Sequence, residues 1–133
     1  MSKKKVARPA SGTDEAVEPI PVAFLATEIK TPPFSQDARL RAGWLLWQLQ
    51  QGVVIPMPHN RPMPSLAPRC GELRMPDGDV TWRIVYRRDS DALLIADAFA
   101  KKTSKTPQEH KERVLKRLAR YDEVKRAASE TKK

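Results

Sequence analysis

The order of predicted elements indicates a small α+β domain, in which helices pack on one face of an antiparallel or mixed sheet of about four strands. A strand-like run at 20–29 precedes a helical pattern, and three further strand-like runs follow at 70–75, 80–87 and 91–99. Short turns join these runs, so they should pair antiparallel. A second helical pattern begins after residue 106. The α+β class follows from the change between helical and strand periodicity of the apolar residues along the chain.

The length of 133 residues suits one domain. Residues 1–18 are polar and charged, which predicts a disordered tail. We assign 19–127 to a single domain and expect 128–133 to fray at the end of the last helix.

Residues 20–29, IPVAFLATEI, predict a first strand. The helix after it has Ser35 as its N-cap and Gly52 just beyond its end. Its apolar positions recur at helical spacing, at Ala38, Ala42, Leu45, Leu46 and Leu49. We interpret Trp44 and Trp47 as packing residues rather than as platforms on which bases stack.

Five prolines between residues 56 and 68 exclude a helix or a central strand there. This segment should be a stiff, extended loop. The final helix should begin at the capping box Thr106-Pro107-Gln108-Glu109. Its packing stripe is predicted to contain Val114, Leu115, Leu118 and Tyr121.

Alternation along VTWRIVYR sends Arg83 and Arg87 to the face opposite Trp82, Ile84 and Tyr86. In the preceding run, Glu72 and Arg74 also share a face. We therefore expect one surface to carry the charged set Glu72, Arg74, Arg83 and Arg87. Lys101, Lys102 and Lys105 follow the last strand and should lie at its rim.

These charges have two interpretations. They could be solvated strand residues with cross-strand ion pairs, Glu72 with an arginine for instance. Alternatively they bind phosphate, for which the guanidinium fork is well shaped. The grouping of arginines on adjacent strands favours the second, with single-stranded RNA as the ligand.

The formal net charge of +9 also favours an anionic partner. The lone Cys70 excludes an internal disulfide and fits a reducing compartment. His59 and His110 have no metal-ligand spacing, so we expect no metal and no cofactor. With no apolar run long enough for a membrane span, we expect a cytoplasmic protein that does not bind a membrane.

One metal-free reaction suits the charged set: attack of an RNA 2′-hydroxyl on the adjacent phosphate. Glu72 is the candidate base. Arg83 would stabilise the phosphorane, with Arg74, Arg87 and Lys105 binding the RNA. Lys101 or Lys102 could act as the acid that protonates the leaving oxygen, or could clamp the phosphate.

Four segments stand out in combination: PPFSQDARLRAGWLLWQLQQG, RPMPSLAPRCGELRM, WRIVYRRDSDALLIADAFAKKT and TPQEHKERVLKRLARYD. In this order they resemble the phage-derived branch of the RelE/HigB toxin family, from about residue 20 to residue 123. The resemblance implies a RelE-like fold and the toxin of a type II toxin–antitoxin pair. Such toxins are typically ribosome-dependent endoribonucleases that cut mRNA in the A site without a metal.

The resemblance also implies partners: the ribosome with its mRNA, and a helix-turn-helix antitoxin through which alone the toxin reaches operator DNA. Arg83 matches the family's phosphate-binding arginine, Glu72 a catalytic glutamate of some relatives, and Lys101 and Lys102 the basic pair of this branch. Several relatives end with a catalytic histidine or tyrosine. Here we assign Tyr121 to packing and interpret His110 as a solvated residue.

Two other functions compete with this one. One is a non-catalytic basic module that binds RNA or protein, such as a degenerate toxin. The other is a DNA-binding regulator, which is disfavoured because the whole sheet separates the two long helices, leaving no helix-turn-helix.

Overall fold

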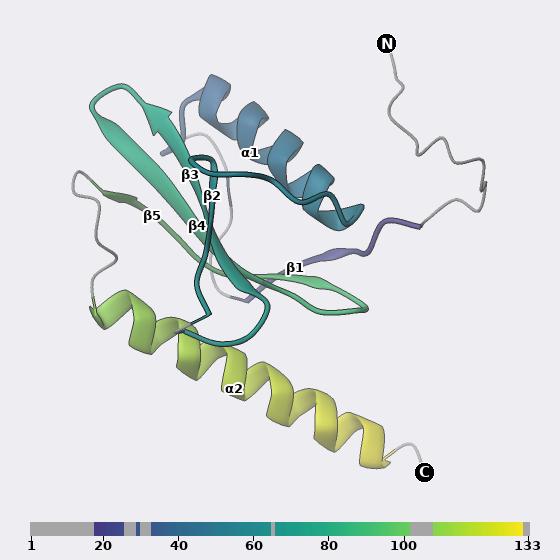
Figure 1. Cartoon of the computed structure of the whole chain (residues 1–133). Coiled ribbons are helices and arrows are strands. Elements are labelled where there is room, and N and C mark those ends of the chain that lie inside the picture. Colours follow the sequence, from purple (N-terminus) through teal and green to yellow (C-terminus); the bar gives the residue numbers. More distant parts are fainter. Residues whose placement is uncertain (1–17, 26–28, 30–32, 65, 102–107, 132–133) are drawn as a thin grey trace.

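The computed structural model describes residues 18–25, 29, 33–64, 66–101 and 108–131. Within them, five strands form one sheet flanked by two helices, which confirms the α+β class (Figure 1). The elements are β1 (Val22–Phe24), α1 (Gln36–Gln50), β2 (Asn60–Pro62), β3 (Cys70–Asp77), β4 (Val80–Arg88), β5 (Leu93–Lys101) and α2 (Gln108–Thr131).

The sheet is mixed, with the order β1-β5-β4-β3-β2. Strand β1 pairs parallel to β5, and the other neighbours are antiparallel. The expected count of about four strands is corrected to five because the proline-rich segment contributes β2. This strand lies at the sheet edge, where Pro62 removes no hydrogen bond from a central ladder.

The predicted signals at both ends of α1 are confirmed. The Ser35 hydroxyl accepts a hydrogen bond from the Ala38 amide at 3.0 Å. Gly52 has φ of +85°, which favours glycine, directly after the helix. The predicted apolar stripe is buried. The interpretation of Trp44 and Trp47 as packing residues is wrong, because both are exposed on the outer side of α1.

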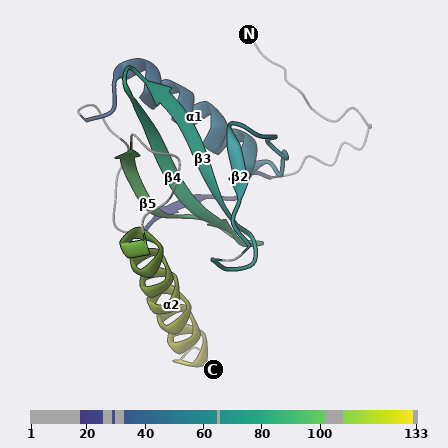
Figure 2. The ribbon, with the colours of Figure 1, turned by 60° about the vertical axis from the view of Figure 1, so that its left-hand side comes forward.

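The two helices cover opposite faces of the sheet, so the prediction that they share one face is wrong (Figure 2). The physical reason lies in β5, which is apolar on both sides. Leu93 and Ile95 belong to the core under α1, whereas Leu94 and Ala96 pack with α2. A strand of this kind needs a cover on each face.

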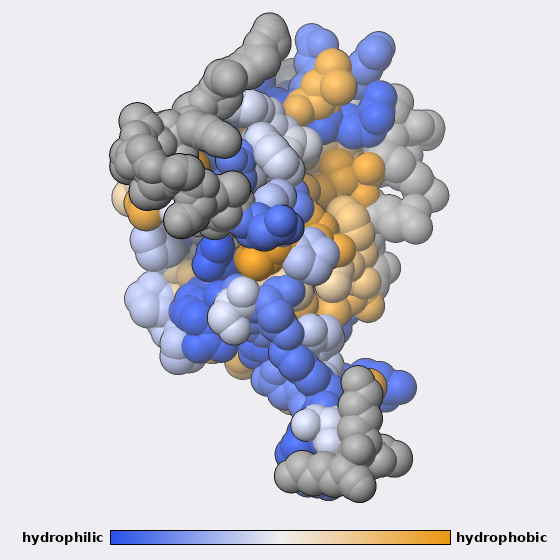
Figure 3. Space-filling model, turned by 90° about the vertical axis from the view of Figure 1, so that its right-hand side faces the viewer, coloured by the Kyte–Doolittle hydropathy of each residue, from blue (hydrophilic) through white to orange (hydrophobic). Residues whose placement is uncertain are grey.

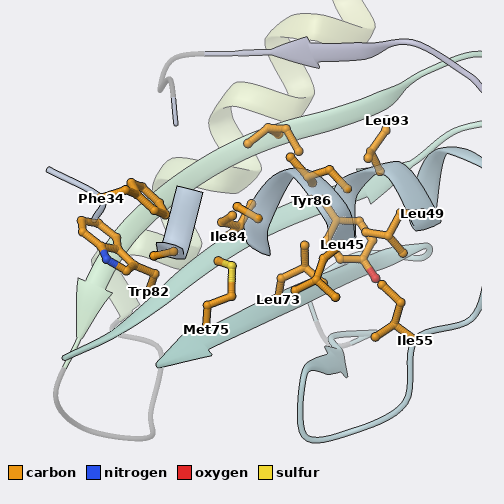
Figure 4. Close-up of a cluster of buried hydrophobic side chains, with 14 residues drawn as sticks. Phe34, Leu45, Leu49, Ile55, Leu73, Met75, Trp82, Ile84, Tyr86 and Leu93 are labelled. Carbon is orange, nitrogen blue, oxygen red and sulfur yellow. The ribbon is translucent and has the colours of Figure 1, made fainter. Parts of the chain in front are cut away.

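The core under α1 is the larger of the two, and Figure 4 shows its side chains between the helix and the strands. Phe34 stacks on Trp82 with ring centroids 3.8 Å apart. Trp82 also donates from Nε1 to Asp77 at 2.8 Å, which satisfies its polar atom.

A β-bulge in β5 decides what the α2 face carries. Val85 pairs with Asp97 but its neighbour Tyr86 pairs with Ile95, so Ala96 is an extra residue. After the bulge, Asp97 and Phe99 lie on the α2 side of the sheet. Without the bulge, the alternation of Leu93 and Ile95 would have continued through them on the α1 side.

Helix α2 packs through Val114 and Leu118, with Tyr121 partly buried, but Leu115 is exposed and its predicted packing is wrong. The helix runs to Thr131, past residue 128 where the sequence predicts fraying. Its C-terminal part projects from the body and presents a hydrophilic surface (Figure 3). No helix in the described part of the chain is long and apolar enough to span a membrane.

Candidate functional site

The charged set predicted from alternation does lie on one face of the sheet, the face toward α2. Arg74 pairs directly with Arg83 between β3 and β4, and Glu72 pairs with Val85. The structure brings Glu72, Arg74 and Arg83 into contact. It holds Arg87 apart from them, toward the other end of β4.

Glu72 is the centre of this group. Its Oε1 accepts hydrogen bonds from Arg74 Nε and Arg83 Nη1, each at 3.1 Å. The Glu72 side chain is 0% exposed and that of Arg83 only 3%. Burial lowers the pKa of Arg83, and Glu72 opposes that shift. These residues are therefore a buried ion-paired group rather than solvated strand residues.

Arg61 extends the group onto β2. It lies opposite Glu72 in the β2–β3 register, on the same face, and it is exposed. Its charge contributes to the lowered pKa of Arg83. We call Arg61, Arg74 and Arg83 the arginine row, because they follow one another across β2, β3 and β4. Sequence reasoning missed Arg61, since it assigned the proline-rich segment to a loop.

Arg87 has a different set of partners. Its guanidinium donates to Asp89 at 2.8 and 2.9 Å and to Asp122 of α2 at 3.0 and 2.7 Å. The hydrogen bonds that Arg87 donates to Asp122 and Asp89 raise its pKa. This arrangement ties α2 to the sheet. An RNA-binding role for Arg87 stays a prediction that competes with this structural one.

The bulged end of β5 meets the first turn of α2 in a second group. His110 Nδ1 lies 2.7 Å from Asp97 Oδ2, and the imidazole stacks on Phe99 with centroids 3.7 Å apart. The His110 side chain is 16% exposed, so its interpretation as a solvated residue is wrong. The signal that would have found it is Asp97, but only the bulge turns that carboxylate toward α2.

Two arginines of α2 complete this group. Arg113 Nη1 lies 3.4 Å from Asp97 Oδ2 and 2.9 Å from His110 Nδ1. Arg117 Nη1 lies 3.4 Å from Asp97 Oδ1 and donates to the Ala96 carbonyl at 2.7 Å. Because a neutral imidazole nitrogen cannot donate and accept at once, Nδ1 either donates to Asp97 or accepts from the Arg113 guanidinium. The tautomer that donates to Asp97 has its acceptor lone pair on Nε2.

The two groups meet through Phe99. This residue pairs with Arg83 between β4 and β5, and its ring stacks against the imidazole of His110. The arginine row thus leads across the sheet to a histidine oriented by a carboxylate. The apolar contacts of α2, through Val114 and Leu118, cover the other half of this face. Such a surface can bind an anionic chain and offer it a proton acceptor.

Of the predicted lysines, Lys101 ends β5 opposite Thr81. Its side chain lies outside the described part of the structure, as do Lys102 and Lys105. Among the described residues, no group of three or more His, Cys, Asp or Glu side chains could hold a metal ion.

Residues 32–119 match the model of a family described as Phage derived protein Gp49-like (DUF891). The match covers more than half of the chain. It contains the arginine row, Asp97 and His110. No curated protein matches the chain. No solved structure matches it either.

Proposed function

The chain belongs to the family of phage-derived Gp49-like proteins, and we propose that it is the toxin of a type II toxin–antitoxin pair that cleaves mRNA on the ribosome. The family's association with RelE-like toxins supports this proposal. The observation that carries it is that the arginine row and His110 adjoin on one face of the sheet, where Phe99 pairs with Arg83 and stacks on His110.

The arginine row would bind the RNA backbone. Arg61 is exposed and Arg74 partly exposed, so these two guanidiniums would meet phosphate first. Arg83, buried beside Arg74 on the neighbouring strand β4, would add positive charge to the phosphate site. Glu72 keeps Arg74 and Arg83 in place through the hydrogen bonds that its Oε1 accepts from them. Such preorganised donors are what a phosphorane intermediate requires.

His110 is the better placed general base. A base must reach the 2′-hydroxyl, and Glu72 is enclosed between two guanidiniums, whereas His110 lies at the edge of the row. Its Nε2 would take the 2′-hydroxyl proton while the 2′-oxygen attacks phosphorus. The bond to the 5′-oxygen then breaks and a 2′,3′-cyclic phosphate forms. Lys101 or Lys102 would protonate the leaving oxygen, which is one of the two roles that the sequence offers for them, the other being a phosphate clamp.

Partners follow from the same proposal. The toxin would act on ribosome-bound mRNA. A helix-turn-helix antitoxin would neutralise it and carry it to operator DNA. The reaction as written requires no metal ion and no cofactor.

Inducible expression without any partner gene tests the proposal. Wild type should arrest growth and produce new mRNA ends on ribosomes. His110→Gln should relieve the arrest while keeping the fold, because the glutamine amide can still donate a hydrogen bond to Asp97. Arg74→Ala should weaken it. Arg126→Ala, at the projecting end of α2, is the matched control and should arrest growth as wild type does. A harmless wild type that leaves mRNA intact would refute the proposal.

The burial of Glu72 and Arg83 also favours the second candidate, a module that binds RNA or protein without cutting it. In that case purified protein would retain mRNA on ribosomes, and single-turnover assays would show no cleavage. His110→Gln would then leave RNA binding unchanged.

A further inference from the structure

Helix α1 carries a second, outward-facing apolar stripe. Leu40, Trp44 and Trp47 are 59%, 61% and 43% exposed. They occur at i, i+4 and i+7 and therefore line one side of the helix. We call these three residues the outer ridge. The inner stripe of the same helix, which includes Ala42 and Leu45, already fills the core.

The outer ridge has the form of a helix-packing surface. A row at this spacing fits the groove of one further helix, and two indole rings supply much of the area that such contacts bury. Aromatic side chains of this size also dominate the binding energy of many interfaces. A single ridge two turns long matches the width of one partner helix.

The charges beside the outer ridge indicate the sign of the partner's charge. Arg39 and Arg41 are exposed on α1, and its one carboxylate, Asp37, lies in the first turn. Arg41 lies three residues before Trp44 and contributes to the lowered pKa of Asp77 on β3, and Arg39 is the other exposed cation of the helix. A second copy of this chain would bring another net charge of +9. An acidic helix would be attracted instead.

We propose that the outer ridge is a docking surface for an amphipathic helix of an acidic partner protein. The helix would lay its apolar face on Trp44 and Trp47 and direct glutamate or aspartate toward Arg39. This surface lies on the α1 side of the sheet, away from the arginine row. The inference thus goes beyond RNA cleavage and does not depend on it.

A designed peptide of about 20 residues tests the proposal, long enough to form a helix on binding. It carries leucine at i, i+4 and i+7 and glutamate on both flanks, and a second peptide has lysine in place of glutamate. The full chain is titrated with each while tryptophan emission and peptide anisotropy are recorded. Trp82 is buried in the core, so a blue shift reports on Trp44 and Trp47.

The acidic peptide should bind with a blue shift, and Trp44→Glu should weaken binding about ten-fold or more. Val124→Glu is the matched control, because Val124 is also an exposed apolar helix residue, on α2. It should bind as wild type does. The lysine peptide should bind about ten-fold more weakly than the acidic one. Thermal unfolding of each variant shows that its fold is kept.

Several results would overturn the proposal. One is an acidic peptide that does not bind, or that binds wild type and Trp44→Glu equally. Another is a dimer in sedimentation equilibrium that Trp44→Glu converts to a monomer, which would make a second copy the occupant. A third is a blue shift with anionic vesicles or an RNA oligonucleotide but not with the acidic peptide.

Discussion

Glu72 Oε1 lies 3.1 Å from Arg83 Nη1, and both side chains are buried within the sheet face that α2 flanks. A carboxylate and a guanidinium withdrawn from water are costly unless they satisfy one another. Here Arg74 adds a third charge, also 3.1 Å from the same oxygen. Glu72 and Arg83 therefore stabilise one another, and the positions of the guanidiniums of Arg74 and Arg83 in the arginine row depend on Glu72.

The first prediction concerns stability. Glu72→Gln removes the charge that balances Arg83, so the free energy of unfolding should fall by about 3 kcal/mol in urea. Glu112→Gln, on the exposed side of α2, is the control and should change it by less than about 0.5 kcal/mol. Equal stability of Glu72→Gln and wild type would show that water, not Glu72, compensates the guanidinium.

The sequence predicts some of this site and not the rest. Alternation along β4 is a local property, and it correctly places Arg83 and Arg87 on one face. Helix α1 likewise begins where Ser35 can cap it. Burial of Glu72 is not local, because it depends on the pairing of β3 with both neighbours. The position of Asp97 depends on a bulge, for which the residues around Ala96 carry no distinctive signal.

The solvent exposure of individual side chains also could not be predicted from the local sequence pattern. Trp44 and Trp47 are large and apolar, as core residues are. Only the packed structure shows that the inner stripe of α1 fills the core without them. In β5, the apolar character of both faces was visible in the sequence. It is the observation from which a helix on each side could have been inferred.

The second prediction concerns pH. The hydrogen bond from Arg87 lowers the pKa of Asp122 below its ordinary 3.8. A carboxylate with a lower pKa in the folded state stabilises the fold above the unfolded pKa, and this contribution is lost as pH falls through the folded value. The unfolding free energy of wild type should thus decline between about pH 5 and pH 2 more steeply than that of Asp122→Asn.

Chemical unfolding at several pH values measures this difference. Asp77 and Asp91 also have lowered pKa values, so the curve of wild type minus Asp122→Asn isolates the Arg87 contact. Parallel curves for the two proteins would show that the contact contributes nothing in solution.

The third prediction uses two glycines. A Cβ on Gly71 would lie 2.4 Å from Tyr86 Oη and 2.6 Å from Cζ, on a ring fixed in the core. Gly71→Ala should therefore lower the unfolding free energy by about 1–3 kcal/mol. Gly43 in α1 has nothing within 4 Å of the same position. Gly43→Ala should raise the unfolding free energy by about 0.5–1 kcal/mol through helix propensity. Thermal unfolding of both variants measures the contrast, and an unaffected Gly71→Ala would contradict the packing of Tyr86.

The fourth prediction follows from the proposed RNA contact. If Arg61 and Arg74 each neutralise a phosphate, either substitution by alanine should reduce the slope of log K against log salt by about 0.7 for single-stranded RNA. Fluorescence anisotropy with a labelled oligonucleotide gives the slope. Arg126→Ala should leave it unchanged. A slope that stays at the wild-type value in Arg61→Ala would place the RNA elsewhere.

The last prediction treats Asp97 as a positioning residue for His110. His110→Gln should slow single-turnover cleavage by about 10²–10⁴-fold, the range of a lost general base. Asp97→Asn should slow it too, because an amide cannot hold the Nδ1–H tautomer as a carboxylate does. If Asp97 acts through His110, the double variant should be no slower than His110→Gln alone. Additive effects would mean that Asp97 supports the site only through Arg113 and Arg117, and rates of the four proteins decide between these outcomes.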